Sequence, residues 1–145
     1  MARLGVRADA LSSVWETEPV DSRGPLWFLN MVARVPVSRP PEELLDLMME
    51  VERQAGRTRV IRNEPRVLDL DLLLVDGLRV EGPKLTLPHP RMWERRFVMA
   101  PLAELDPDLR NRGTGLTVLG TYRSLGGRPE VRKVGVLAAP AAGPL

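Results

Sequence analysis

The sequence predicts a single α+β domain in which helices cover an antiparallel or mixed β-sheet. Its 145 residues suit one domain better than two. Stretches with two-residue alternation are separated by stretches with helical periodicity. The 12 glycines and 14 prolines divide the chain into short, clearly bounded segments. We expect the domain to occupy residues 1–137, followed by a disordered tail at 138–145 (AAPAAGPL) that has nothing to bury.

Two strands are predicted in the first quarter of the chain. The first covers residues 11–17 (LSSVWET) and ends before Pro19, because proline cannot donate to a strand ladder. The second covers residues 28–35, where apolar side chains alternate. Its expected buried face carries Leu29, Met31, Ala33 and Val35, and its other face carries Phe28, Asn30, Val32 and Arg34.

Residues 41–55 are predicted to form a helix. Prolines precede and open this segment, Glu42 and Glu43 lie in its first turn where the helix dipole favours acids, and Gly56 follows its last residue. The core-facing stripe with helical spacing consists of Leu44, Met48, Val51 and Ala55.

The second half of the chain alternates between strand and helix signals. A third strand is predicted at 66–75 (RVLDLDLLLV), which ends in the Asp76–Gly77 turn. Further predicted elements are a short hairpin (78–80 with 85–87), helices at 92–105 and 116–125, and a last strand at 131–136.

Composition excludes several classes of site. The chain has no cysteine, which excludes disulfides, a thiol nucleophile and cysteine-ligated zinc, and its one histidine excludes a multi-histidine metal site. No apolar run is long enough to span a bilayer, and the first residues lack a signal-peptide core, so we expect a cytoplasmic protein. The net charge of +2 is too small to indicate bulk binding of nucleic acid.

The basic residues are almost all arginine, since Lys84 and Lys133 are the only lysines beside 19 arginines. Two interpretations stay open at this point. The bias can reflect genomic base composition, or it can serve phosphate binding, because a guanidinium group contacts phosphate oxygens in pairs.

The predicted strand at 66–75 carries the clearest chemical signal. Its even-numbered leucines form one apolar face, so Asp69 and Asp71 project from the other face, about 7 Å apart along the strand. Two such carboxylates repel each other unless they are paired, and Mg²⁺ suits a few carboxylates combined with phosphate oxygens. The alternative is a surface ion network with neighbouring arginines. Arginines cluster before and within this segment, at 57, 59, 62 and 66, which favours phosphoryl transfer.

His89 and Phe28 are further candidates for ligand contacts. His89 lies between two prolines before a predicted helix, so a stiff backbone aims its ring, although a helix-capping role is the simpler interpretation. Phe28 shares a strand face with Asn30, a pairing that suits a flat heterocycle with ring N–H groups, although most aromatic residues only fill a core.

Several blocks of the sequence together resemble one known family. They are SSVWETEPV, FLN, GRTR, PRVLDLDLLL and LTLPHPRMWERRFVMAPL, in that order between about residues 11 and 108. They resemble the 6-hydroxymethyl-7,8-dihydropterin pyrophosphokinases of folate biosynthesis. The resemblance implies a ferredoxin-like α+β fold. It also implies that pyrophosphate is transferred from ATP to the hydroxymethyl group of the pterin, with two Mg²⁺ ions as cofactors and AMP as the other product.

The resemblance also implies a role for individual residues. Asp69 and Asp71 would hold the metal ions, and Arg57 and Arg66 would be the catalytic residues that neutralise phosphate charge. The implied ATP site consists of Glu52, Arg59, Leu72, Lys84, Thr86, His89 and Arg95. The implied pterin site consists of Thr17, Pro19, Val20, Phe28, Asn30 and Phe97.

The chain also departs from the family pattern. Glu64 stands where the family usually has glycine or alanine, and Asn63 replaces a residue that is aromatic in some members. The family's first strand and most of its first helix have no counterpart, so we expect an N-terminally shortened fold or a start assigned too late. The alternative function is therefore a non-catalytic or inactive pterin- or nucleotide-binding remnant.

We expect a monomer without nucleic-acid or membrane partners, with association with a dihydropteroate synthase as an open question. An RNA-binding module on a ferredoxin-like sheet is a third alternative, suggested by the arginines. The absence of an aromatic RNA-binding pattern on the strands and the acidic face of residues 66–75 disfavour it.

Overall fold

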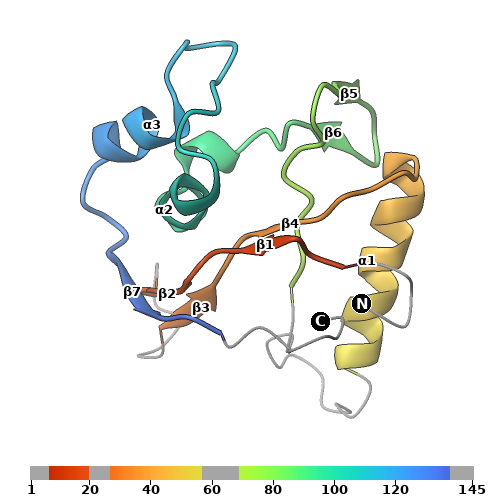
Figure 1. Cartoon of the computed structure of the whole chain (residues 1–145), viewed down its shortest axis with the longest axis horizontal. Helices are drawn as coiled ribbons and strands as arrows, with labels where there is room; N and C mark the ends of the chain where they lie inside the picture. Colours follow the sequence, from red (N-terminus) through yellow and green to blue (C-terminus); the bar gives the residue numbers. More distant parts are fainter. Residues whose placement is uncertain (1–6, 20–26, 57–68, 138–145) are drawn as a thin grey trace.

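The computed structural model describes residues 7–19, 27–56 and 69–137. Helix α1 (Pro41–Ala55) stands apart from the other two helices, and β1 (Ala10–Leu11), β4 (Ala33–Arg34) and the segment after residue 69 run between them (Figure 1). The helices are α1 (Pro41–Ala55), the 3-10 turn η2 (Met92–Glu94), α2 (Arg96–Leu105) and α3 (Val118–Ser124). The strands are β1 (Ala10–Leu11), β2 (Val14–Thr17), β3 (Phe28–Asn30), β4 (Ala33–Arg34), β5 (Val80–Glu81), β6 (Thr86–Leu87) and β7 (Val131–Gly135).

The strands pair in antiparallel fashion throughout the described ranges. Strand β2 lies in the middle of a three-stranded sheet with the order β3-β2-β7, in which Trp15 is opposite both Asn30 and Lys133. Strands β1 and β4 form a separate pair, as do β5 and β6. The α+β class with antiparallel pairing is therefore confirmed.

The predicted strands at 11–17 and 28–35 are each interrupted once. Between β1 and β2, the backbone N–H of Ser12 donates to the carbonyl of Val32, and the Ser12 hydroxyl accepts from the Val32 N–H, both at 2.8 Å. The hydroxyl also donates to the carbonyl of Ser13 at 2.8 Å. Ser12 is only 1% exposed, so these bonds satisfy a buried polar group and keep the two hairpin arms together across the break.

Helix α1 has the bounds that the sequence predicts. Pro41 occupies the first turn, Glu42 and Glu43 lie in that turn, and Gly56 follows the last helical residue. Leu44 and Met48 of the predicted stripe are buried. The helix therefore forms where its local capping and amphipathic signals place it.

The main core lies around α2 and α3. Met92, Val98, Met99, Leu102 and Val118 form its buried cluster. Leu73, Leu74 and Val32 pack against this cluster from other segments. The predicted helix at 92–105 is divided at Arg95, whose backbone is extended, so that η2 precedes α2.

Two strand predictions need correction. Residues 69–75 are not part of any strand in the described structure, because a strand requires a partner ladder and alternation in the sequence supplies only an extended backbone. On the second strand, Leu29 is 67% exposed and Ala33 is also exposed, whereas Val32 contacts the core. The face assignment of Leu29 and Ala33 was therefore wrong, since alternation separates two faces without telling which one is covered.

The predicted hairpin, the last helix and the last strand are present as β5–β6, α3 and β7, each shifted or shortened by a few residues. Among the helices that the structure describes, none is both long and apolar enough to cross a membrane. The tail at 138–145 lies outside the described residues.

Candidate functional site

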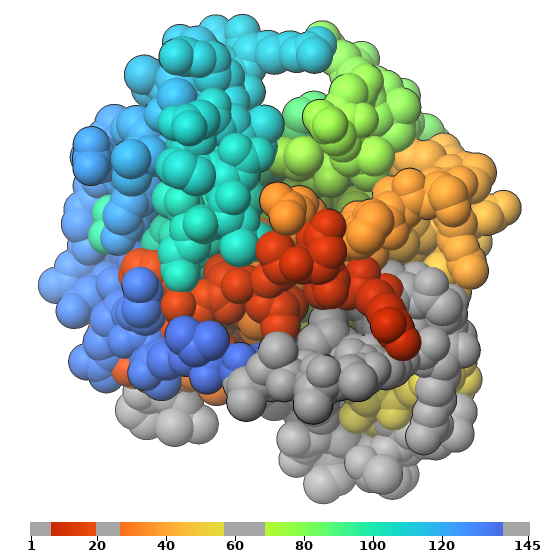
Figure 2. Space-filling view, in the orientation of Figure 1, coloured from red at the N-terminus to blue at the C-terminus, as the bar shows by residue number. Residues whose placement is uncertain are grey.

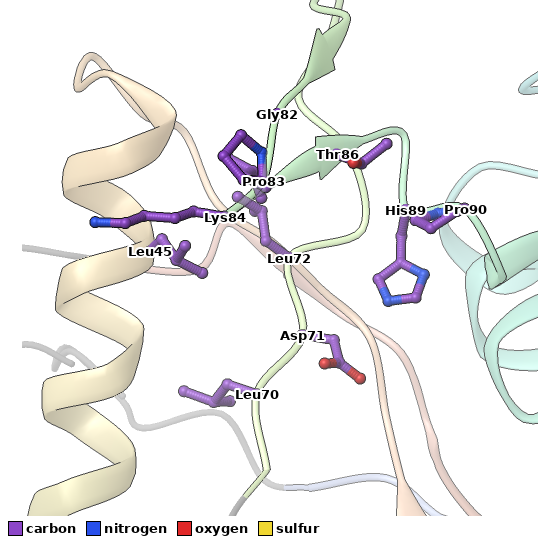
Figure 3. A pocket seen from close by; sticks show the side chains of 11 residues that line it. Leu45, Leu70, Asp71, Leu72, Gly82, Pro83, Lys84, Thr86, His89 and Pro90 are labelled. Carbon is purple, nitrogen blue, oxygen red and sulfur yellow. The ribbon is translucent and has the colours of Figure 1, made fainter.

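A cavity of about 270 Å³ lies between α1, the segment after residue 69 and the β5–β6 hairpin (Figure 3). In Figure 3 the Asp71 carboxylate and the His89 imidazole project to one side of the 70–72 backbone, whereas Leu70 and Lys84 project toward α1. The cavity therefore has a polar part and an apolar part. Its lining comprises Leu45, Leu70, Asp71, Leu72, Gly82, Pro83, Lys84, Leu85, Thr86, His89 and Pro90.

Backbone hydrogen bonds hold these segments in place. The N–H of His89 donates to the carbonyl of Leu73 at 2.6 Å, which fixes the histidine segment beside the acidic one. The N–H of Gly82 donates to the carbonyl of Leu85 at 3.0 Å and closes the turn that carries Lys84. Residues far apart in the sequence are thus held at one cavity by bonds that do not depend on side-chain identity.

Glu52 of α1 anchors the acidic segment from the other side. Its carboxylate accepts a hydrogen bond from the backbone N–H of Leu70 at 2.5 Å. A bond to a charged acceptor is stronger than a neutral one, so it ties residue 70 firmly to the helix. Glu52 itself does not line the cavity. Its position therefore suits a residue that holds the backbone of Leu70 and Asp71 in place.

The His89 ring has one nitrogen engaged by the protein. Its Nδ1 atom accepts a hydrogen bond from the backbone N–H of Arg91 at 3.1 Å. The neutral ring therefore carries its proton on Nε2, which can donate to a ligand oxygen in the cavity. The capping interpretation of His89 and the ligand-binding interpretation are compatible, because each uses a different nitrogen.

The charged groups at the cavity suit an anionic ligand that carries a metal ion. Lys84 supplies a cation, and the Asp71 side chain forms no ion pair or hydrogen bond with the described residues. No group of three or more histidine, aspartate or glutamate side chains is close enough to hold a metal within the described ranges. The Asp71 carboxylate fits Mg²⁺, which keeps water and phosphate oxygens as its other ligands. Asp69, the other predicted metal ligand, is exposed and does not line the cavity.

A second group of predicted residues lies on the β3-β2-β7 sheet. Asn30 donates from Nδ2 to the hydroxyl of Thr17 at 2.7 Å, and Thr17 is 3% exposed. Phe28, opposite Thr17 in the register, is 42% exposed. The side-chain amide is thus oriented by a buried hydroxyl, beside an aromatic ring that is open to contact.

Helix α2 borders this part of the sheet. It contacts both β2 and β3, and it carries Phe97, which packs against the core cluster. The guanidinium of Arg95 lies 5.6 Å from the centre of the Phe97 ring, a cation–π distance. Neither residue lines the cavity.

The end of β2 is held by the segment before β7. The Glu18 carboxylate accepts from the backbone N–H of Glu130 at 2.6 Å and from Arg128 Nη1 at 2.9 Å. The backbone hydrogen bond from Glu130 lowers the pKa of Glu18, burial opposes this shift, and the Arg128 guanidinium lowers the pKa further. The half-buried Pro19, which follows Glu18, is thereby fixed at the edge of the sheet.

The predicted residues thus divide into those that line the cavity, those on the sheet or α2, those described elsewhere and those that the structure does not describe. Those described elsewhere are Glu52, Asp69 and Arg95. Asp71, Leu72, Lys84, Thr86 and His89 line the cavity. Thr17, Pro19, Phe28 and Asn30 lie on or beside the sheet, with Phe97 on α2. Arg57, Arg59, Arg66 and Val20, together with Asn63 and Glu64, lie outside the described residues.

Sequence reasoning missed part of the cavity wall. Leu45 and Leu70 were not predicted to contact a ligand, and Leu70 belongs to the leucine face that was expected to be core. Leu70, Asp71 and Leu72 are consecutive yet all line the cavity, which a flat strand with two opposite faces does not allow. The turn sequence Gly82–Pro83 was the available signal for a loop that closes over the site.

Comparisons with known proteins agree with these features. Residues 1–107 match the sequence model of the 7,8-dihydro-6-hydroxymethylpterin-pyrophosphokinase family. The chain is 43% identical over 109 residues to the 2-amino-4-hydroxy-6-hydroxymethyldihydropteridine pyrophosphokinase of Bacillus subtilis, covering 75% of this chain and 65% of that protein.

Two further relatives show how much of each protein the match covers. The pyrophosphokinase of the same name from Methylorubrum extorquens is 39% identical over 108 residues, covering 74% of this chain and 68% of that protein. The mitochondrial folate synthesis bifunctional protein of Arabidopsis thaliana is 42% identical over 105 residues, covering 72% of this chain and 19% of that protein. The match therefore spans about two thirds of each bacterial relative and about a fifth of the plant protein.

Proposed function

Because this chain belongs to the 7,8-dihydro-6-hydroxymethylpterin-pyrophosphokinase family, we propose that it transfers pyrophosphate from ATP to 6-hydroxymethyl-7,8-dihydropterin, a step of folate biosynthesis that releases AMP. The observation that carries this proposal is the cavity at which Asp71, Lys84, Thr86 and His89 meet. These groups suit a polyphosphate that carries a metal ion.

The nucleotide would occupy both parts of the cavity. Leu72, with Leu45 and Leu70, offers an apolar wall suited to a flat base, and Lys84 offers a positive charge for phosphate. The Thr86 hydroxyl and the Nε2–H of His89 are donors for phosphate or ribose oxygens. Glu52 would act through Leu70, and Arg95 would act from outside the cavity lining. Arg59, named by the resemblance, would complete the set.

Asp69 and Asp71 are the residues that would hold magnesium, with two ions as the family resemblance implies. When bound, the metal supplies positive charge that offsets the negative charge of the ATP phosphates. Asp71 would orient that charge at the cavity, and Asp69, which does not line the cavity, would do so from two residues before it. Arg57 and Arg66, named by the resemblance, would add guanidinium charge during transfer.

The acceptor would bind between the sheet and α2. Asn30, oriented by Thr17, would read the edge of the pterin, and Phe28 and Phe97 would contact its faces. Pro19 would lie at the rim, and Val20, named by the resemblance, would complete the set. In the transfer itself, the hydroxymethyl oxygen forms a bond to the β-phosphorus of ATP. The bond from that phosphorus to the α-phosphate bridging oxygen breaks, AMP leaves, and the hydroxyl proton passes to solvent.

Other expectations stay predictions. They are the ferredoxin-like topology, the shortened N-terminus, a single domain at 1–137, the cytoplasmic location, the monomeric state and association with a dihydropteroate synthase. The alternative of an inactive binding remnant is decided by the experiment below.

The test is production of AMP from ATP in the presence of magnesium and the hydroxymethyl pterin. Asp71→Asn should lower the rate by about a hundredfold or more, because it removes a charge placed for the metal and phosphates. Asp76→Asn is the matched control, since Asp76 lies in an exposed turn outside the cavity lining. A wild-type chain that melts cooperatively but forms no AMP would instead support the binding remnant.

A further inference from the structure

Glu104, in the last turn of α2, connects this helix to β2 and β7. Its Oε1 atom accepts from the indole Nε1 of Trp15 at 2.6 Å and from the backbone N–H of Ser13 at 3.2 Å. Its Oε2 atom accepts from the Ser13 hydroxyl at 2.8 Å and lies 3.9 Å from Lys133 Nζ. One carboxylate thus binds Trp15 of the central strand and Ser13 just before that strand, and it faces a cation on the neighbouring strand.

These contacts are stronger constraints than an exposed ion pair. Hydrogen bonds to an ionised acceptor are short and directional, and Ser13 is 6% exposed, so its donors have little access to water. Removing the acceptor would leave a buried N–H and a buried hydroxyl without this partner. Figure 2 shows the N-terminal strands in red between α2 in teal and β7 in blue.

The contact joins the two walls proposed for the pterin. On β2, Trp15 lies two residues before Thr17 and therefore on the same face of the strand. Their partners on β3 are Asn30 and Phe28. On α2, Glu104 follows Phe97 by seven residues, two helical turns, so both lie on the same side of the helix.

We propose that Glu104 is a positioning residue that sets the spacing between strand β2, which carries Thr17, and helix α2, which carries Phe97. This inference rests on the proposed function. Glu104 lies away from the cavity lined by Lys84 and His89. Its loss should therefore weaken pterin binding and leave nucleotide binding unchanged.

The experiment is steady-state AMP formation by wild type and Glu104→Gln, with the KM for ATP and the KM for 6-hydroxymethyl-7,8-dihydropterin measured separately. The glutamine keeps the size but replaces one acceptor oxygen with a donor that opposes Trp15 or Ser13. The pterin KM should rise by about tenfold, because small displacements of binding groups have large effects. The ATP KM should stay within about twofold of wild type because, of the residues proposed for ATP, only Arg95 adjoins α2, and it does not line the cavity.

Two further variants keep the test decisive. Trp15→Phe removes the indole donor alone, so it should raise the pterin KM by a smaller factor than Glu104→Gln does. This milder variant should fold even if Glu104→Gln does not. Glu50→Gln is the matched control, because Glu50 pairs with Arg53 on the same helix, α1, away from the sheet. It should change neither KM.

The outcomes separate the two proposals. An active wild type in which Glu104→Gln and Trp15→Phe raise both KM values equally, or raise neither, overturns the positioning role alone. A wild type that forms no AMP overturns the proposed function and this inference with it. A selective rise in the pterin KM supports both.

Discussion

The hydrogen bond at Nδ1 of His89 leads to a quantitative prediction for nucleotide binding. Since Nδ1 is occupied by the Arg91 N–H, Nε2 is the ring donor that remains for a phosphate or ribose oxygen. In His89→Asn, the shorter side chain retains an acceptor near the position of Nδ1 and loses the donor at Nε2. A hydrogen bond to a charged group contributes about 1.5–3 kcal/mol. At about 1.4 kcal/mol for each factor of ten, the KM for ATP should rise about 10- to 150-fold.

The assay is AMP formation at varied MgATP with the pterin held at saturation. His89→Gln is the complementary variant, because it places an amide donor near the Nε2 position and lacks the acceptor near Nδ1. It should therefore retain more affinity for ATP than His89→Asn. Thermal melts of both variants check that the turn before η2 is intact. A wild-type ATP KM in His89→Asn, or a weaker ATP affinity in the glutamine variant than in the asparagine variant, would refute the reasoning.

Three further predictions concern stability. Met99→Ala empties part of the core where Met99 is 0% exposed, so it should cost about 2–5 kcal/mol and lower Tm by roughly 10 °C, whereas Met49→Ala, at a side chain 60% exposed, should stay within about 0.5 kcal/mol. The Thr121 hydroxyl is buried without a hydrogen-bond partner in the described structure, so Thr121→Val should be neutral or stabilise by up to about 1 kcal/mol in chemical denaturation; a clear loss would reveal a partner. Burial alone would raise the pKa of Glu104, but the hydrogen bonds from β2 lower it below its ordinary value of 4.5. Its carboxylate therefore stabilises the fold above pH 4.5, and this contribution is lost as pH falls through the lowered pKa. The Tm difference between wild type and Glu104→Gln should shrink below pH 4.5, and a constant difference from pH 7 to pH 3 would contradict the role of ionisation.

The elements that the sequence predicted well are those with local signals. Helix α1 has its predicted bounds because proline, first-turn acids and a following glycine all act within a few residues of its ends. The β5–β6 hairpin and the Asp76–Gly77 turn are equally local, and Gly77 adopts a φ of 70° that favours glycine. Such features require no knowledge of distant partners.

The features that the sequence did not predict depend on distant partners. Residues 69–75 alternate like a strand, yet the contacts that hold them are the Glu52 carboxylate on Leu70 and the His89 N–H on Leu73. No periodicity encodes either contact. Leu29 was assigned to the core for the same reason, because a two-residue repeat cannot tell which face of the sheet another element covers.

The sequence predicted more of the candidate site than of the fold that supports it. Asp71, Lys84, Thr86 and His89 were identified from residue type, motif and family resemblance, and they do line one cavity. Glu104 escaped notice because a glutamate in the last turn of a helix is ordinarily solvated. Only the structure reveals that its acceptors satisfy buried donors of another element.

The residues of the candidate site thus lie mostly on segments with little regular structure, and a few hydrogen bonds hold each segment in place. The cavity depends on a backbone bond between Leu73 and His89, which no side-chain substitution removes, and on the carboxylate of Glu52. The sheet side depends on the carboxylates of Glu18 and Glu104. Because a carboxylate has up to four acceptor positions, one acidic side chain can fix several donors of an irregular segment at once. We therefore infer that several acidic residues outside the proposed metal pair serve to position other groups, which explains why Glu52 bonds to a residue that lines the cavity and yet does not line it.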